Sequence, residues 1–133
     1  MMMLYQLMPW SVLALRLALG AIFLVHGSPK MKNSQAMAGG MGMSASKVWL
    51  IGLIETLAAI SMIAGLFTHI GAIAIMVIMI GALYYKIEKW HVPFTAMDKT
   101  GWEFDLIILA AAFAMATIGA GTLSVDWLIL GMY

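Results

Sequence analysis

Long apolar runs alternate with more polar segments along this chain of 133 residues. Four stretches, at about 10–27, 46–66, 69–90 and 102–121, are close to the 20 mostly apolar residues that a helix needs to cross a bilayer. No Asp, Glu, Lys or Arg occurs at 56–85, so two of these stretches can be joined by a tight turn, which we place at 65–69. The pattern predicts an all-α integral membrane four-helix bundle in a single domain over 1–133.

The composition supports this prediction. Hydrophobic residues make up 64% of the chain and charged residues only 10%. A soluble domain of this length leaves too much of its surface exposed to hide so many apolar side chains, so the lipid bilayer is the expected partner. A net charge of +1 argues against nucleic-acid binding. The absence of Cys excludes disulfides and thiolate metal sites.

The placement of lysines predicts the orientation. The first apolar stretch carries Arg16 in its middle and has no basic segment before it or clear cleavage site, which favours a retained helix over a signal peptide. Lysine is confined to the segments at or beside 28–45 and 91–101. By the positive-inside rule, these two loops of a multi-pass cell membrane protein are expected to be cytoplasmic and both termini to point outward.

Arg16 and Glu55 are charged residues within predicted spans. Arg16 precedes Gly27 by eleven residues and Glu55 follows Ser46 by nine, which places them roughly 16 Å and 13 Å from the same membrane face at 1.5 Å per residue. Because charges at such depth need partners, we expect a buried Arg16–Glu55 ion pair across the bundle. One possibility is that this pair has a purely structural role and locks the helices together. The alternative is that it handles protons or a ligand.

Small residues at helical spacing predict the faces on which the helices pack. The predicted faces contain Arg16, Gly20, Phe23 and Gly27; Gly52, Glu55 and Ala59; Ala74, Gly81, Tyr85 and Glu88; and Glu103, Ala110, Ala114, Thr117 and Gly121.

Several polar residues flank the membrane at the lysine-bearing side. His26, Lys30, Glu103 and His91 could form a polar pocket at the mouth of the bundle, a common position for small-ligand sites. For Glu103 the alternative is a capping box over 100–103 at the start of the fourth helix. Asp105 projects from nearly the opposite face of that helix.

The residues offer no paired metal-ligand spacing, and no metal site is predicted. The segment 28–45 holds four methionines, whose thioethers select Cu(I). The alternative is that these methionines are flexible apolar filler.

Motifs along nearly the whole chain resemble the DoxX family. They are RLALG at 16–20, FLVHG at 23–27 with Lys30, Gly52 with Glu55, GLFT at 65–68, MIGA at 79–82, WEFDL at 102–106, and the G-x-G and S-x-D pairs within 119–126. The segment 28–45 is the part least similar to the family.

The resemblance implies a four-helix membrane protein associated with terminal-oxidase or quinone oxidoreductase systems. We therefore expect an accessory or quinone-interacting subunit, with other membrane or redox proteins as partners and His26, Lys30 and Glu103 around the ligand. No residue type in the chain carries electrons itself, so a redox role would need a bound quinone or a partner's cofactor. The alternatives are a non-catalytic assembly subunit of a larger membrane complex and a small transporter gated by Arg16 and Glu55.

Overall fold

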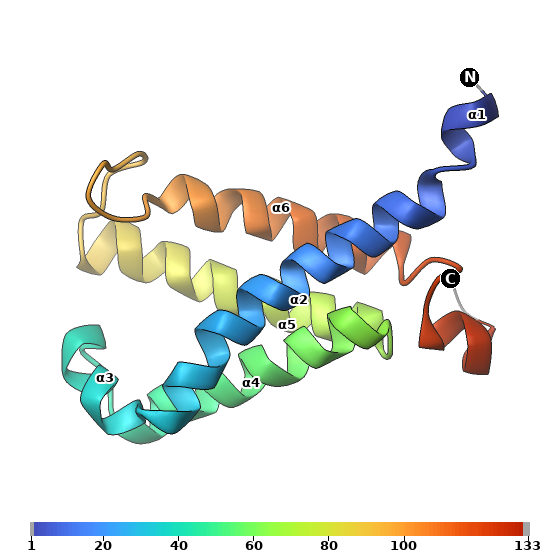
Figure 1. Ribbon diagram of the computed structural model, residues 1–133. Helices are drawn as coiled ribbons and strands as arrows, with labels where there is room; N and C mark the ends of the chain where they lie inside the picture. The colour runs from blue at the N-terminus through green and yellow to red at the C-terminus, as the bar shows by residue number, and fades with distance from the viewer. Residues whose placement is uncertain (1, 132–133) are drawn as a thin grey trace.

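The computed structural model describes residues 2–131, and this part of the chain contains helices and no strand (Figure 1). The all-α fold expected from the sequence is therefore confirmed. The elements are α1 (Met2–Tyr5), α2 (Met8–Lys32), α3 (Ser34–Met41), α4 (Ala45–Ala64), α5 (Thr68–Tyr84), the π-helix η1 (Tyr85–Lys89), α6 (Trp102–Ile118) and the π-helix η2 (Asp126–Leu130).

The helices form two antiparallel pairs. α2 packs against α4, and α5 packs against α6. Contacts between α4 and α5, which share a tight turn, and a shorter contact between α2 and α6 join the pairs. Figure 1 shows that the pairs lie close together near the α4–α5 turn and diverge toward the other end of the bundle.

Two glycines fix the register of α2 against α4. A Cβ atom added to Gly27 would lie 2.9 Å from the carbonyl oxygen of Gly52, and one added to Gly52 would lie 2.8 Å from that of Gly27. The two backbones are therefore in direct contact, which only residues without a side chain allow.

The sequence predicted the buried faces of the first pair but not of the second. All the residues of the predicted faces of α2 and α4 are buried. The predictions for α5 and α6 are largely wrong, because none of the predicted residues is fully buried, although Ala74 packs against the core. The buried residues are Thr68, Gly71, Ala72, Ile75 and Met79 on α5, and Asp105, Ile108, Ala112 and Met115 on α6.

The outer surface is the kind that lipid covers. Among residues 2–131, three helical segments are long and apolar enough to cross a membrane: Met8–Lys32, Ala45–Ala64 and Thr68–Lys89. Between 22% and 33% of the residues in their apolar windows are buried, so most of their apolar side chains point outward. α6, with 17 residues, is not among these three segments, and it packs along α5.

The predicted loop at 28–45 is largely helical. α2 continues past Gly27 to Lys32 with Pro29 inside it, and α3 follows almost at once. Close packing of Gly27 on Gly52 holds this part of α2 against α4 and offsets the backbone hydrogen bond that Pro29 cannot make. The predicted turn between the second and third helices is found at 65–67.

Candidate functional site

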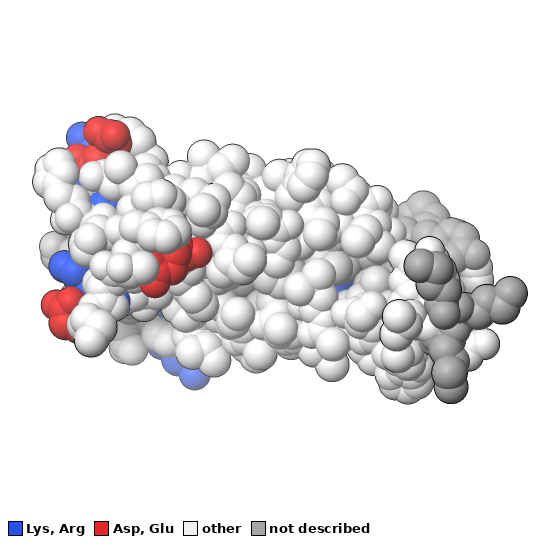
Figure 2. All heavy atoms as spheres, turned by 90° about the horizontal axis from the view of Figure 1, so that it is seen from above, with Lys and Arg blue, Asp and Glu red and all other residues white. Residues whose placement is uncertain are grey.

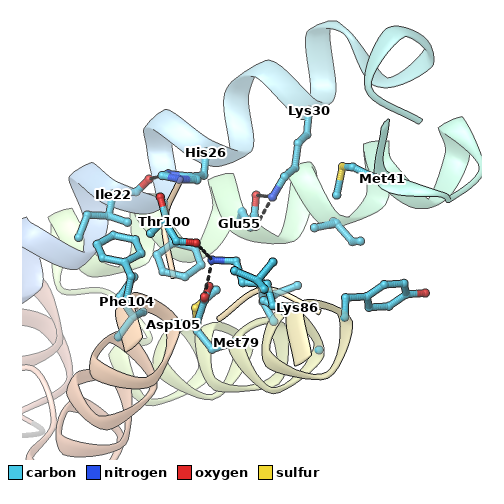
Figure 3. A pocket seen from close by; sticks show the side chains of 18 of the residues that line it. Ile22, His26, Lys30, Met41, Glu55, Met79, Lys86, Thr100, Phe104 and Asp105 are labelled. Atoms are coloured by element: carbon cyan, nitrogen blue, oxygen red, sulfur yellow. Dashed lines mark hydrogen bonds and ion pairs between the residues drawn. The ribbon is translucent and has the colours of Figure 1, made fainter. Parts of the chain in front are cut away.

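A cavity of about 520 Å³ lies between the two helical pairs, at the end where they diverge. All four long helices, η1 and the segments that follow α3 and η1 contribute to its wall. Most of the wall is apolar. Its polar side chains, several of them visible in Figure 3, are His26, Lys30, Glu55, Tyr85, Lys86, Trp90, Lys99, Thr100 and Asp105.

One ion pair stands on the α2–α4 side of the cavity. The Lys30 ammonium donates to both carboxylate oxygens of Glu55, at 2.6 and 2.7 Å. The Glu55 side chain is 3% exposed and that of Lys30 14%. The contact between Gly27 and Gly52 brings the helix backbones close enough for these side chains, each three residues further along its helix, to meet.

A second ion pair stands on the α5–α6 side. Lys86 in η1 donates to Asp105 Oδ2 at 2.5 Å and also to the carbonyl oxygen of Thr100 at 3.4 Å (Figure 3). Single π-helical turns often occur at functional sites, where the extra residue re-aims side chains. The widened turn of η1 places both Tyr85 and Lys86 on the cavity wall.

The structure brings together two of the four residues predicted for a polar pocket, and His91 is not among the residues that line the cavity. His26 and Lys30 line the cavity, and the His26 ring is fixed by a 2.9 Å hydrogen bond between Nδ1 and the carbonyl oxygen of Ile22. Glu103 is not among the residues that line the cavity. Its Oε2 is buried without a hydrogen-bond partner in the described part of the chain.

The capping box proposed for Glu103 is also absent. α6 begins at Trp102, with Gly101 rather than Thr100 as its N-cap, and no side chain caps it. The carbonyl oxygen of Thr100 instead accepts from Lys86.

The predicted Arg16–Glu55 ion pair is wrong, because each residue has another partner. Glu55 pairs with Lys30. Arg16 is 1% exposed and donates to backbone carbonyls: Nε to Met62 at 3.0 Å, Nη1 to Ala120 at 2.6 Å and Leu123 at 3.0 Å, and Nη2 to Ile63 at 3.5 Å.

The error lies in the register of α2 against α4. The prediction aligned Gly27 with Ser46, as two helix ends, but α2 extends to Lys32 and Gly27 packs on Gly52. Glu55 therefore lies beside Gly27, eleven residues from Arg16 along α2. At 1.5 Å per residue this is roughly 16 Å, too far for an ion pair.

Arg16 and Asp126 together secure the α4–α5 turn. Met62 and Ile63 are in the last turn of α4, where unpaired carbonyls favour a cation. Asp126 accepts from the backbone amides of Phe67 and Thr68, at 2.8 and 3.0 Å, and so caps the start of α5. The two charges also attract one another electrostatically.

The C-terminal segment is shaped to reach Arg16. Gly119 and Gly121 adopt positive φ angles of 84° and 72°, which glycine reaches without strain, and between them Ala120 presents its carbonyl to Arg16. The G-x-G and S-x-D pairs noted in the sequence are thus part of this buried contact.

Sequence reasoning missed Lys86, Asp105 and Asp126 as members of these polar sites. A signal existed for Asp105, which lies on the opposite face of its helix from Glu103 and needs a partner away from lipid. For Lys86 the π-helical turn that aims it has no evident sequence signature.

The arrangement of the side chains gives no direct support for a metal site. Within residues 2–131 no group of three or more His, Cys, Asp or Glu is arranged to hold a metal ion. Two of the four methionines of segment 28–45, Met41 and Met43, line the cavity. Copper binding by these thioethers stays a hypothesis from the sequence.

Comparison with known proteins agrees with the resemblance found in the sequence. The sequence model of the DoxX family matches residues 11–88, more than half of the chain. The chain is also similar to a protein of Bacillus subtilis (strain 168) named "Putative oxidoreductase CatD". The two are 29% identical over 119 residues, which cover 87% of this chain and 84% of the relative. No solved structure matches the chain significantly.

Proposed function

This chain belongs to the DoxX family of membrane proteins, and on that premise we propose that it is a quinone-interacting accessory subunit of a membrane redox system. Its partners would be the lipid bilayer and other membrane or redox protein subunits. Similarity to a relative named as an oxidoreductase supports the redox setting.

The observation that carries the proposal is the chemistry of the cavity. A quinone has a flat apolar ring with two carbonyl oxygens that accept hydrogen bonds. The cavity is largely apolar and places an ammonium group on each of two opposite sides, Lys30 on α2 and Lys86 on η1. Each ammonium has three N–H donors, so it can keep its carboxylate partner and still donate to a quinone oxygen.

Bound quinone would supply the electron-carrying chemistry, which the side chains of this Cys-free sequence do not offer. The protein's own contribution would be to orient the ring and exclude water. His26 and Lys99, which also line the cavity, add further hydrogen-bonding groups.

The same proposal includes an orientation in the membrane. The lysines lie at the diverging end of the bundle, and Figure 2 shows charged side chains gathered at that end of the visible surface. The positive-inside rule supports a cytoplasmic location for this end and an outward location for both termini. The cavity would then open near the cytoplasmic face.

Quinone binding can be tested directly. Purified protein in detergent is titrated with menadione, and quenching of tryptophan fluorescence is followed, since Trp90 lines the cavity. We expect saturable quenching, weakened roughly tenfold by Lys86→Met because a hydrogen bond from a charged donor is lost.

Two variants serve as matched controls. Lys47→Met removes an exposed lysine at the same end of the bundle, and Glu103→Gln alters a carboxylate near the cavity but not on its wall. Both should bind menadione as the unmodified protein does. Non-saturable quenching, or equal weakening by Lys47→Met and Lys86→Met, would overturn the quinone site and favour the assembly-subunit alternative.

A further inference from the structure

We propose that the cavity opens sideways into the bilayer between α4 and α5, and that its ligand is a membrane-dissolved amphiphile whose apolar chain passes through this opening. The inference rests on the proposed quinone site and adds how the ligand enters and which part of it stays in lipid.

α4 and α5 separate steadily from their shared turn. Near the turn they are in contact, since a Cβ added to Gly71 would lie 2.8 Å from the Cβ of Ser61. Ten residues further along α5, or about 15 Å, a Cβ added to Gly81 would meet nothing within 4 Å. Figure 1 shows α4 and α5 diverging over this length, and Gly81 lines the cavity, so the gap between the two helices lies at the depth of the cavity.

The residues at this gap belong both to the cavity and to the outer surface. Gly81 lines the cavity and is exposed. Val77, one turn away on α5, also lines the cavity although it is 63% exposed. On the α4 side, Ile51 lines the cavity and is half-buried. A wall made of outward-facing apolar residues is an opening toward lipid.

The other end of the cavity faces water. Its wall there is formed by Val92, Lys99 and Thr100, between η1 and α6, and by Met41 and Met43, at and just after the end of α3; Lys99 and Thr100 are exposed. An apolar chain would leave this end only by entering water. It would leave the α4–α5 gap by entering lipid, at no hydrophobic cost.

The charged side chains on the cavity wall indicate the chemistry of the ligand's headgroup. Three lysines and two carboxylates line the cavity, so the excess charge is positive and favours a headgroup rich in acceptor oxygens. The ligand class is therefore an amphiphile with an oxygen-bearing ring or headgroup inside the cavity and one apolar chain directed into the bilayer.

Gly81 provides the test, because a large side chain there would fill the opening without strain: the residue is helical and its Cβ position is empty. Gly81→Trp is compared with Gly40→Trp, which changes another helical, exposed glycine with no neighbour within 4 Å, outside the cavity wall. Both are titrated with menadione and with menaquinone, which adds an isoprenoid chain to the same ring.

We expect Gly81→Trp to weaken menaquinone binding by about tenfold or more and menadione binding by less than about twofold, and Gly40→Trp to change neither. Equal affinities of Gly81→Trp and the unmodified protein for menaquinone would overturn the lateral opening and leave the quinone site standing. Failure of the unmodified protein to bind either compound would instead reject the proposed function, and the opening with it. If thermal unfolding shows that Gly81→Trp does not fold, Gly81→Leu replaces it. The smaller leucine side chain should also weaken menaquinone binding more than menadione binding.

Discussion

The two ends of the bundle use buried charge in different ways. At the end near the α4–α5 turn, Arg16 and Asp126 bind backbone groups that belong to other parts of the chain. At the diverging end, Lys30 pairs with Glu55 inside one helical pair, and Lys86 with Asp105 inside the other. The buried charges therefore join the two helical pairs to one another at the α4–α5 turn and leave the helical pairs separate at the diverging end.

This difference explains why a cavity exists at the diverging end. The contacts of Arg16 connect α2 to the end of α4 and to the segment after α6, so a single side chain holds three parts of the bundle together. Neither of the two ion pairs at the lysine-bearing end crosses from one helical pair to the other. There the space between the pairs is available to a ligand.

The largest effect is expected from removing Arg16. Arg16→Met would leave the carbonyls of Met62, Ala120 and Leu123 buried without this donor and Asp126 without its nearby positive charge. Breaking such a buried charge network costs about 3–5 kcal/mol. We expect a lower free energy of unfolding by about this amount, or no folded protein, measured by denaturant unfolding in detergent micelles.

Lys32→Met, at the exposed end of α2, is the control and should unfold as the unmodified protein does. An Arg16→Met variant of unchanged stability would show that the turn end does not depend on this residue.

Removal of the second charge at the turn should have a smaller effect. Asp126→Ala takes away both acceptors of the Phe67 and Thr68 amides, and loss of a helix cap costs about 0.5–2 kcal/mol. Phe67 has a positive φ of 51°, so its strained backbone depends on this support. We expect faster amide hydrogen exchange at 65–68, with little change at 45–55.

Asp126→Asn is informative beside the alanine variant. Its amide oxygen can still accept from one of the two backbone N–H groups, so its exchange rates should fall between those of the unmodified protein and those of Asp126→Ala. Equal exchange in all three proteins would mean that the cap contributes nothing to the turn.

The sequence was sufficient for the four long helices and the α4–α5 turn, but not for α3, the π-helical turns or the packing faces of α5 and α6. The long helices follow from the length of the apolar runs, which lipid thickness constrains. The packing face is harder, because side chains toward lipid and toward the core are both apolar and small residues are the main signal. That signal fails at Gly81, which faces the opening of the cavity, and at Ala110, which is exposed.

The polar partners were only partly predictable for a related reason. That Arg16 and Glu55 would be buried follows from the cost of charge in lipid. Which partner each would find depends on helix register, and this is set by the contact of Gly27 with Gly52 rather than by where the apolar runs end. Arg16 donates its hydrogen bonds to backbone carbonyls. Every residue has such a group, so the sequence does not show which of them will lie beside a buried charge.

The smallest effect on stability is expected when both members of the Lys86–Asp105 ion pair, at the diverging end, are replaced together. Lys86→Met alone leaves Asp105, whose side chain is 8% exposed, without its ammonium partner and should destabilise the protein by about 1–3 kcal/mol. Replacing both, with Lys86→Met and Asp105→Leu, should recover most of this loss, because apolar residues often substitute for a buried ion pair without cost.

The double variant should nevertheless bind menadione as weakly as Lys86→Met does, because the donor on this side of the cavity is still missing. Thermal unfolding and the fluorescence titration, performed on the same samples, separate the two readouts. If recovery of stability also restored binding, Lys86 would matter only for holding η1 against α6. If binding stays weak in a stable protein, the ammonium at this end of the bundle acts on the ligand, in contrast to the charges at the turn, which act on the chain itself.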